Sequence, residues 1–318
     1  MTATASKDRR FERFAWGSLA YTFFVILFGA VVRITGSGAG CGQHWPTCQG
    51  EVAHLPRSVE TAIELTHRVT SGLSLLLVIA LLIGAFRRFE RGHTARRAAA
   101  LSLLFMVFEA LIGAALVLLA LVGKNDSAAR AAVMAAHLVN TSLLTAALTI
   151  TAWSARARAP LAGQSSRTLR AIFGLAIAGM LVVSTSGAVT ALGDTLYPVS
   201  EGARFEGTHF LQRLRVLHPI LAILVAGYLS YAIGALAAPA SRLPARIAFV
   251  LLFAQVGAGV LNVLLSAPGW LQVVHLALAT ALWITLILLG AEAISTGTVR
   301  PATGRQQPRQ SQSAAPAP

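Results

Sequence analysis

Long apolar runs separated by short polar segments dominate the chain and set its predicted elements. A helix needs about 20 largely apolar residues to cross a bilayer, and each run reaches that length. The runs lie at residues 14–34, 62–86, 98–122, 128–153, 169–192, 210–237, 245–265 and 270–294. The pattern predicts an all-α membrane protein with eight transmembrane helices.

Composition supports this interpretation and excludes two classes of protein. Of the 318 residues, 55% are hydrophobic and only 12% are charged, against about 25% charged residues in an ordinary soluble domain. The chain is therefore neither a water-soluble globular protein nor a disordered one. Its net charge of +14 would suggest a nucleic-acid partner only if the basic residues were clustered on a soluble face, which they are not.

The basic residues instead favour one side of the membrane. Most of the 26 Lys and Arg fall in the two termini and in the second, fourth and sixth connections between spans. By the positive-inside rule, both termini are expected to be cytoplasmic. The N-terminus lacks the pattern of a signal or transit peptide, which predicts a bacterial cytoplasmic-membrane protein whose first span is retained. The segment after residue 294 is polar and rich in Pro, Gln and Ser, and is predicted to be a disordered tail.

Four short matches in the same order indicate an internal duplication. The GAV motif at Gly29 recurs at Gly187, and FEALIGAALVLL from Phe108 recurs loosely as AQVGAGVLNVLL from Ala254. Histidines supply the other two matches. With four spans per half, both halves have the same orientation, so a pseudo-twofold axis would run along the membrane normal. The predicted domains are a cytoplasmic segment 1–13, a bundle 14–153, a linker 154–168, a bundle 169–294 and a tail 295–318.

Spans 2, 4, 6 and 8 each carry one histidine soon after they enter from the outer side: His67, His137, His218 and His275. The helical rise places all four about 9 to 14 Å below the outer surface. Intramembrane ionisable residues are costly and usually functional. Two imidazoles facing each other across a bundle can take both axial positions of a haem iron. The sequence predicts two haem sites, ligated by His67 with His137 and by His218 with His275.

Other interpretations of these histidines remain open. A single intramembrane histidine can simply donate a hydrogen bond to a carbonyl group of a neighbouring helix. Zinc fits less well, because each bundle would offer two ligands where zinc takes three or four. The remaining histidines are expected to be solvated surface residues: His44, His54, His93 and His209.

The two halves differ near these histidines. Glu64 precedes His67 by three residues, and the repeat places Arg215 at the matching position. A carboxylate beside one haem can act as a base or stabilise a developing cation, whereas an arginine beside the other can pair with a haem propionate. The alternative role for Glu64 is an ion pair with Arg68, one helical turn away. A second acid, Glu109, stands where the repeat has Gln255, and no role is assigned to it.

Cys41 and Cys48 are the only cysteines, and both lie in the first outer loop. An oxidising outer compartment favours a disulfide between them. Two free thiols are the alternative, and a redox role is also open because an exposed bridge can exchange thiols. The nearby glycines resemble a phosphate-binding loop only weakly, since no strand precedes them.

Together these residues resemble the haem A synthase family. The likeness rests on the run GAVVRITGSGAGCGQHWPTCQG, the E-x-x-H-R of Glu64, His67 and Arg68, and single histidines in the later even spans, and it covers residues 14–294. It implies oxidation of the C8 methyl group of haem O to the formyl group of haem A, through two hydroxylations and loss of water from a geminal diol.

The resemblance also implies roles for individual residues. Glu64 matches the family's catalytic glutamate, and the cysteine pair matches Cys41 and Cys48. The substrate haem O would be bound by His67, His137 and Arg68. A resident haem b that passes electrons would be bound by His218, His275 and Arg215. Two departures are visible: the third outer loop, residues 193–209, has no second cysteine pair, and the glutamine typical of the third span is Glu109 here.

The resemblance implies partners for the protein, and two other functional interpretations stay open. The partners would be a haem O-producing farnesyltransferase, the assembly of a terminal oxidase and an electron carrier that the sequence does not identify. The main alternative is a di-haem b electron-transfer cytochrome, which needs the four histidines but neither Glu64 nor a lopsided repeat. A transporter is a third class, disfavoured because no pair of broken helices is evident.

Overall fold

The computed structural model describes residues 3–156, 166–198, 209–237 and 242–296, and this part of the chain is helical with short connections. The long helices are α1 (Ala3–Ile34), α2 (Val59–Arg88), α3 (Thr94–Leu118), α4 (Ala128–Ser154), α5 (Arg167–Leu196), α7 (Leu217–Leu236), α8 (Arg242–Leu264) and α9 (Gly269–Thr296). The short helix α6 (Phe210–Arg213) and a 3-10 turn, η2 (Leu214–Val216), lead into α7. The turn η1 (Ser37–Ala39) follows α1.

Within these residues, eight helical segments are long and apolar enough to cross a membrane. They confirm the predicted all-α class and coincide with the eight predicted spans to within a few residues. The first span begins earlier than predicted, at Arg9 rather than near residue 14, and α3 stops at Leu118 rather than near residue 122. Ala120 adopts a φ of 52° there, and the amide of Leu121 donates to the carbonyl of Leu116 at 2.8 Å. This is a left-handed helix cap that usually carries glycine, so the apolar sequence does not reveal it.

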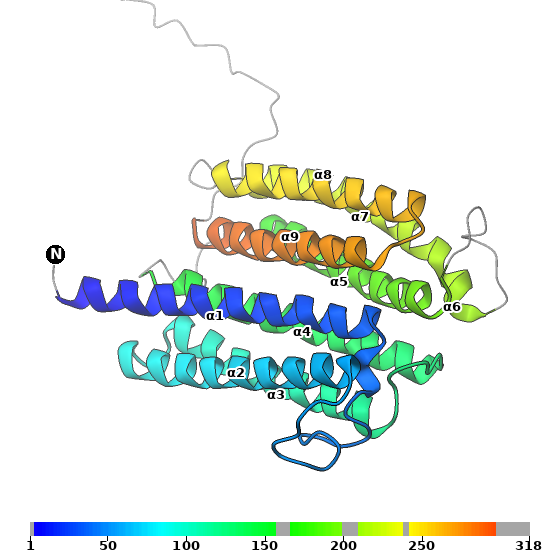
Figure 1. The fold of residues 1–318 in the computed structure, drawn as a ribbon. Coiled ribbons are helices and arrows are strands. Elements are labelled where there is room, and N and C mark those ends of the chain that lie inside the picture. The colour runs from blue at the N-terminus through cyan, green and yellow to red at the C-terminus, as the bar shows by residue number, and fades with distance from the viewer. Residues whose placement is uncertain (1–2, 157–165, 199–208, 238–241, 297–318) are drawn as a thin grey trace, which may run out of the picture.

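The helices form two groups of four (Figure 1). In the first group, α1, α2, α3 and α4 each pack against two neighbours and close a ring; α5, α7, α8 and α9 do the same in the second. Contacts between the groups run through α1, α4, α5 and α9. The ring contacts of the first group have counterparts in the second when each helix is exchanged for its repeat partner, whereas the contact between α7 and α9 has no counterpart of similar extent. The pseudo-twofold relation and the division into domains stay predictions.

Each group has its own apolar core. In the first group the core includes Leu81, Leu144 and Leu148, and in the second it includes Leu229, Ile233 and Leu286. Many other large apolar side chains face outward along the spans, such as Ile223, which is 73% exposed. A helix surface of this kind is stable only in a lipid environment. The protein is therefore a multi-pass membrane protein.

Polar contacts tie the two groups together. Arg33 at the end of α1 donates to the carbonyl of Ala191 in α5 at 2.7 Å and to Oε1 of Gln272 in α9 at 3.0 Å. The indole of Trp283 in α9 donates to the carbonyl of Ser142 in α4 at 2.9 Å. Because a hydrogen bond inside a membrane has no water to compete with it, these contacts hold the interface in one register.

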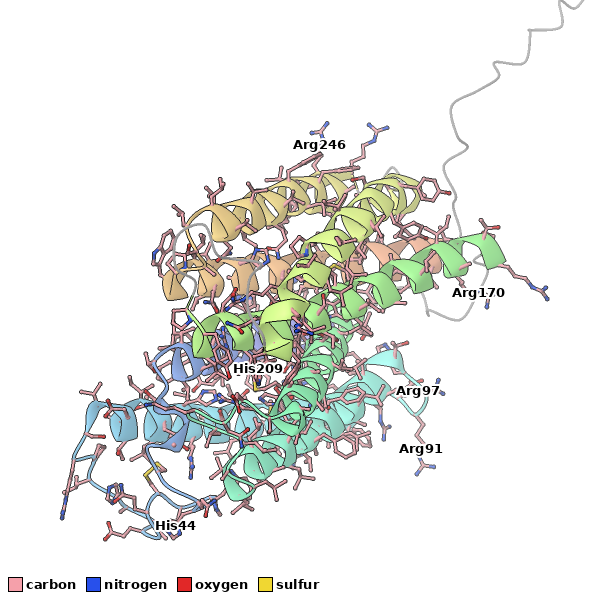
Figure 2. All side chains as sticks on the ribbon, turned by 90° about the vertical axis from the view of Figure 1, so that its right-hand side faces the viewer. His44, Arg91, Arg97, Arg170, His209 and Arg246 are labelled. Carbon is pink, nitrogen blue, oxygen red and sulfur yellow. A yellow bond between two sulfur atoms is a disulfide. The ribbon has the colours of Figure 1, made fainter. Side chains whose placement is uncertain are left out.

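The two ends of the molecule differ in charge. The end that contains the segment between α1 and α2 is called the disulfide end, and the opposite one is called the basic end. Figure 2 shows Arg91, Arg97, Arg170 and Arg246 projecting outward, away from His44. Of the predicted tail at 295–318, the first two residues belong to α9, and residues 297–318 lie outside the described residues, as do residues 157–165 of the predicted linker at 154–168.

Candidate functional site

The four predicted histidines lie at a similar level near the disulfide end. Each one is six to nine residues after the first residue of its span: Val59 for His67, Ala128 for His137, Phe210 for His218 and Gly269 for His275. The helix starts are local features. Ser58 caps α2 by accepting a hydrogen bond from the amide of Thr61, and Ser127 caps α4 in the same way from Arg130. Chain-local signals therefore set the depth of each ring.

In the second group, the rings of His218 and His275 lie close together. Their centroids are 6.3 Å apart and their planes are nearly perpendicular, at 87°. Metal–imidazole bonds are about 2 Å long, so two imidazoles on opposite sides of one metal have ring centres about 6 Å apart. The observed spacing therefore fits two axial ligands of a single iron.

In the first group, His67 of α2 and His137 of α4 lie within electrostatic range of each other. Phe28 of α1 packs edge-on against the ring of His67, with centroids 5.8 Å apart. Nδ1 of both histidines is buried and accepts or donates no hydrogen bond of good geometry. An imidazole nitrogen without a close partner in an apolar interior is unfavourable, so each of these rings needs a nearby polar or bound group.

Glycines make room for three of these rings. A Cβ atom on Gly29 would lie 3.2 Å from Cε1 of His67, and one on Gly187 would lie 3.0 Å from Cε1 of His218. On Gly259, it would lie 3.3 Å from Cε1 of His275. Gly29 and Gly187 are the glycines of the repeated GAV motif. The motif recurs because α1 and α5 must each approach a histidine of the next span closely.

Three histidines have polar neighbours on an adjacent helix. Ser186 of α5 lies 3.0 Å from Nδ1 of His218, measured from its hydroxyl oxygen. The side-chain amide nitrogen of Gln255 in α8 is 3.1 Å from Nε2 of His275. A carboxylate oxygen of Glu109 in α3 is 3.5 Å from Nδ1 of His137. Neighbours of this kind orient metal-binding histidines and tune them.

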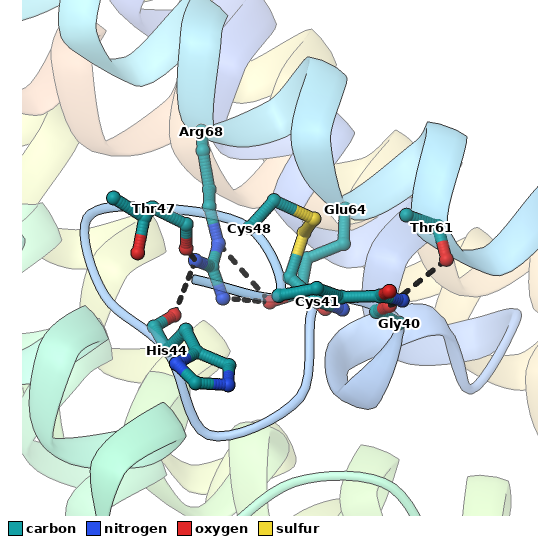
Figure 3. A network of polar contacts seen from close by, with 9 residues as sticks. Gly40, Cys41, His44, Thr47, Cys48, Thr61, Glu64 and Arg68 are labelled. Atoms are coloured by element: carbon teal, nitrogen blue, oxygen red, sulfur yellow. Dashed lines mark hydrogen bonds and ion pairs between the residues drawn. A yellow bond between two sulfur atoms is a disulfide. The ribbon is translucent and has the colours of Figure 1, made fainter. Parts of the chain in front are cut away.

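Glu64 is buried beneath the loop between α1 and α2, and both of its oxygens are engaged (Figure 3). Oε1 accepts hydrogen bonds from Nε of Arg68, at 3.1 Å, and from Nη2. Oε2 accepts one from the backbone amide of Cys41 at 2.8 Å. The predicted ion pair with Arg68 is therefore present. It coexists with a position one helical turn from His67, so the pair does not exclude a role beside a haem.

Cys41 and Cys48 form a disulfide, as predicted. Nη1 of Arg68 donates to the carbonyls of His44 and Thr47, both at 2.6 Å, and so fixes the loop that the disulfide closes (Figure 3). A Cβ atom on Gly40 would lie 2.6 Å from the backbone of Glu60, so only glycine allows the loop to approach α2 this closely. The disulfide, Arg68 and Glu64 form one connected unit.

Arg215, the residue that the repeat matches to Glu64, is also buried in an ion pair. Its Nε lies 2.7 Å from Oδ1 of Asp194, and both side chains are at most 5% exposed. Nη2 donates to the carbonyls of Gly193, at 3.1 Å, and Tyr197. The guanidinium thus joins the end of α5 to the start of α7. Its predicted contact with a haem propionate stays a prediction.

Of the other four histidines, expected to be solvated surface residues, His93 and His209 are half-buried helix caps and the side chain of His54 is largely buried. His93 accepts a hydrogen bond from the amide of Ala95 and caps α3, and His209 caps α6 in the same way from Leu211. The side chain of His54 is only 7% exposed and contacts Glu51 at 2.9 Å. An imidazole that accepts a backbone hydrogen bond at a helix start replaces water there. His44 is exposed, as expected.

An ionisable pair joins the two groups at the disulfide end, outside the spans. The hydroxyl of Tyr197 donates a hydrogen bond to Oδ2 of Asp126. This bond lowers the pKa of the Asp126 carboxyl group and, together with partial burial, raises the pKa of the Tyr197 hydroxyl. His209 stacks on Tyr197 with ring centroids 4.9 Å apart. These residues connect the loop after α3 to the end of α5.

The donor set fits haem better than a bare metal ion. Among the described residues, no group of three or more His, Cys, Asp or Glu side chains is placed to hold a metal ion. Two histidines per group, with glycines beside three of the four rings, match a porphyrin, which would supply the other four iron ligands itself. The residues present therefore fit two haem sites.

Several residues of the site were not singled out in the sequence. They are Ser186, Asp194 and Gly259. Gly259 lies within the second repeat match, and Asp194 is an acidic residue near the end of an apolar span, a signal that could have found it. Ser186 has no such signal, because serine is common in membrane helices and its contact depends on how α5 packs against α7.

Comparisons with known proteins show which proteins and which family the chain is similar to. The chain is 47% identical over 302 residues to proteins named protoheme IX farnesyltransferase from two strains of Thermus thermophilus. The match covers 92% of this chain and 50% of theirs, so the chain spans about half the length of these relatives. It is also 46% identical over 93 residues to the heme A synthase of Bacillus mycoides, covering 29% of this chain and 30% of that protein.

A family match covers most of the chain. Residues 12–287 match COX15-CtaA, described as cytochrome oxidase assembly protein. These residues contain the four paired histidines and every side chain described above as contacting them. The chain therefore belongs to the COX15-CtaA family, the haem A synthase family.

Proposed function

We propose that this protein is a haem A synthase that oxidises the C8 methyl group of haem O to a formyl group. The observation that carries the proposal is the pairing of the four histidines, with His218 and His275 at the spacing of two axial ligands of one iron. Family membership supports the same activity. We assign haem O, as substrate, to the first group, and a resident haem b to the second.

The assignment of the two haems rests on the asymmetry between the groups. Only the first group has a buried carboxylate, Glu64, one turn from a paired histidine and fixed by both Arg68 and a disulfide-closed loop. Conversion of a methyl to a formyl group removes four electrons and four protons and adds the oxygen of one water molecule. Fixed negative charge beside the reacting carbon would stabilise the positive charge that develops as electrons leave it.

The chain's own residues have distinct tasks in this proposal. His67 and His137 bind and orient the substrate, with Arg68 holding Glu64 in place. His218 and His275 hold haem b, which supplies one-electron transfer when bound. Ser186 accepts a hydrogen bond from, or donates one to, Nδ1 of His218 and so orients that ring. The apolar helix faces exclude water from both groups.

The proposed setting is a bacterial cytoplasmic membrane with both termini in the cytoplasm. The Thermus relatives named as farnesyltransferases are twice as long as this chain's match. This supports a partnership between the present protein and a farnesyltransferase that makes haem O. In the proposed setting, the product haem A is supplied to a terminal oxidase, and an electron carrier accepts the electrons.

Haem extraction from membranes tests the function. The protein is co-expressed with a source of haem O, and the extracted pigments are separated by chromatography. Haem A or hydroxylated haem O supports the synthase, and loss of both in Glu64→Ala, with haem O retained, supports the role of Glu64. Haem b alone in every background identifies an electron-transfer cytochrome instead, and a colourless protein excludes both activities.

A further inference from the structure

Glu109 and Gln255 occupy equivalent places in the two groups. Each follows the start of its repeat match by one residue, and each contacts the histidine of the next span. Oε1 of Glu109 in α3 faces Nδ1 of His137 in α4, and the side-chain amide of Gln255 in α8 faces Nε2 of His275 in α9, so the nitrogen left for a ligand is Nε2 in His137 and Nδ1 in His275. The scaffold is shared, but the group presented to the histidine is a carboxylate in one case and a neutral amide in the other.

The Glu109 carboxylate is fixed by residues on the same face of α4 as His137. The Asn140 side-chain amide lies 2.5 Å from Oε2, and the hydroxyl of Thr141 lies 2.5 Å from Oε1. Asn140 and Thr141 follow His137 by three and four residues, so all three project toward α3. Asn140 also donates to the carbonyl of Phe105 at 2.9 Å, which anchors it to α3.

The direction of the contact leaves Nε2 of His137 available. Oε1 of Glu109 lies 3.5 Å from Nδ1, a few tenths of an ångström beyond a hydrogen bond of ordinary length. If Nδ1 donates its proton to the carboxylate, the lone pair of Nε2 faces the other way, toward a metal. A carboxylate that accepts from a ligating imidazole makes the ligand more basic.

We propose that Glu109 is a positioning residue that strengthens His137 as an iron ligand and gives the first haem site a lower reduction potential than the second. The inference rests on the proposed haem binding by the four histidines. A more basic axial imidazole stabilises ferric over ferrous iron, and hydrogen bonding around an axial ligand is one of the means by which proteins tune haem potential. Gln255 provides no such charge, so the second site remains easier to reduce. Electrons would then pass from the first site to the second.

An equilibrium redox titration of the purified full-length protein, loaded by co-expression with a haem O supply, tests this. Glu109→Gln is expected to raise the midpoint potential of the first haem, and Gln255→Glu is expected to lower that of the second. A tenfold change in the preference for ferric over ferrous iron corresponds to 59 mV in a one-electron couple. The same titration is repeated in a His275→Ala background, which removes one ligand of the second haem. The redox signal that remains in this variant belongs to the first haem.

Two further variants separate this role from a structural one. Glu109→Asp keeps the carboxylate and should retain most of the low potential. Glu292→Gln removes a membrane carboxylate that contacts Trp153 at 3.2 Å and lies about 25 Å along α9 from His275, and should move neither potential.

The outcomes distinguish the two proposals. If the wild-type protein binds no haem, the proposed function fails before the role of Glu109 is reached. If haem is retained and neither Glu109→Gln nor Gln255→Glu shifts its site in the stated direction, the positioning role is wrong while haem binding stands. Opposite shifts confined to the altered site establish it.

Discussion

The two groups of four helices hold their histidines with the same steric arrangement and surround them with different polar groups. In both, a glycine of the GAV motif in the first span of the group packs against the ring of the next: Gly29 against His67, and Gly187 against His218. Around that shared arrangement, the first group carries carboxylates, whereas the second presents Gln255 and Ser186 to its rings. The features that the two groups share are those that we propose to bind haem, and the residues that differ are those that we propose to tune it.

The buried ion pairs show the same divergence at the disulfide end. Glu64 and Arg68 belong to one helix and bind a loop that a disulfide closes. Arg215 pairs instead with Asp194 on a different helix and binds the carbonyls at its end. The first pair connects the histidine region to a loop, and the second connects two helices. This difference is consistent with the proposed chemistry beside the first histidine pair and with structural support beside the second.

Removal of single histidines would have the largest effect and would test whether each group holds its own haem. His218→Ala or His275→Ala should lose the haem of the second group, and His67→Ala or His137→Ala that of the first, each about half of the total, because one axial ligand rarely suffices in a bis-histidine site. Pyridine haemochrome analysis of the purified variants measures this. His44→Ala, at an exposed loop position, is the control, and a full haem content in all four variants would contradict the pairing.

Breaking the buried ion pair of the second group should lower the stability of the protein more than breaking that of the first group. Asp194→Asn leaves Arg215 buried without its counter-charge, and a cost of about 3–5 kcal/mol in stability is expected. Arg68→Met should cost less, because Glu64 keeps its bond from the Cys41 amide and Arg68 is 12% exposed. Thermal unfolding in detergent, followed by circular dichroism, ranks the two variants. An equal loss would mean that the pairs are equivalent in function.

The disulfide distinguishes the first group from the described part of the second. The chain-entropy estimate for so short a closed loop gives about 2–3 kcal/mol, so Cys41→Ser with Cys48→Ser should lower stability by that amount. The loss should be local, and limited proteolysis should cleave the loop between α1 and α2 faster while the helices stay protected. Unchanged cleavage would show that Arg68 and Gly40 hold the loop without the bridge.

Glycine variants test whether the steric arrangement is truly shared. Gly29→Ala and Gly187→Ala would each force the neighbouring histidine ring to move by a few tenths of an ångström, and a cost of about 1–3 kcal/mol with weaker haem retention is expected. Gly17→Ala and Gly174→Ala, on the same two helices with no atom near the new Cβ, should be neutral or stabilising by up to about 1 kcal/mol. Haem retention on dilution into detergent measures the difference.

The smallest effect expected is a pH dependence of the contact between Asp126 and Tyr197. The pKa of Asp126 is lowered in the folded protein, so its contribution is present above the unfolded pKa and is lost as pH falls through the folded one. The pKa of Tyr197 is raised, so its contribution is present below the unfolded pKa and is lost as pH rises through the folded one. Tyr197→Phe should flatten both edges of the stability profile, as measured by thermal unfolding across the acid and alkaline ranges. A profile identical to that of the wild type would remove this contact as a link between the groups.

Much of the fold was predictable because it depends on local properties of the chain. Spans 2 and 4 begin near the predicted residues because apolar length and a capping serine before each helix can be recognised in the sequence. The end of α3 was not predictable, because Ala120 adopts a left-handed conformation that is not typical of alanine. Likewise, the helix-capping roles of His93 and His209 depend on the chain direction before the helix begins.

By itself, the sequence determined the eight spans, the depth of the four histidines and the placement of two cysteines in one loop, because helix length, rise and chain proximity require no knowledge of neighbours. Only the tertiary structure decided which groups face those histidines. Glu109 reaches His137 through the rotation of one helix against another, and Glu64 reaches the Cys41 amide through the path of a loop. A rotation of this kind is set by packing across the whole interface, and residue spacing along one chain segment does not encode it.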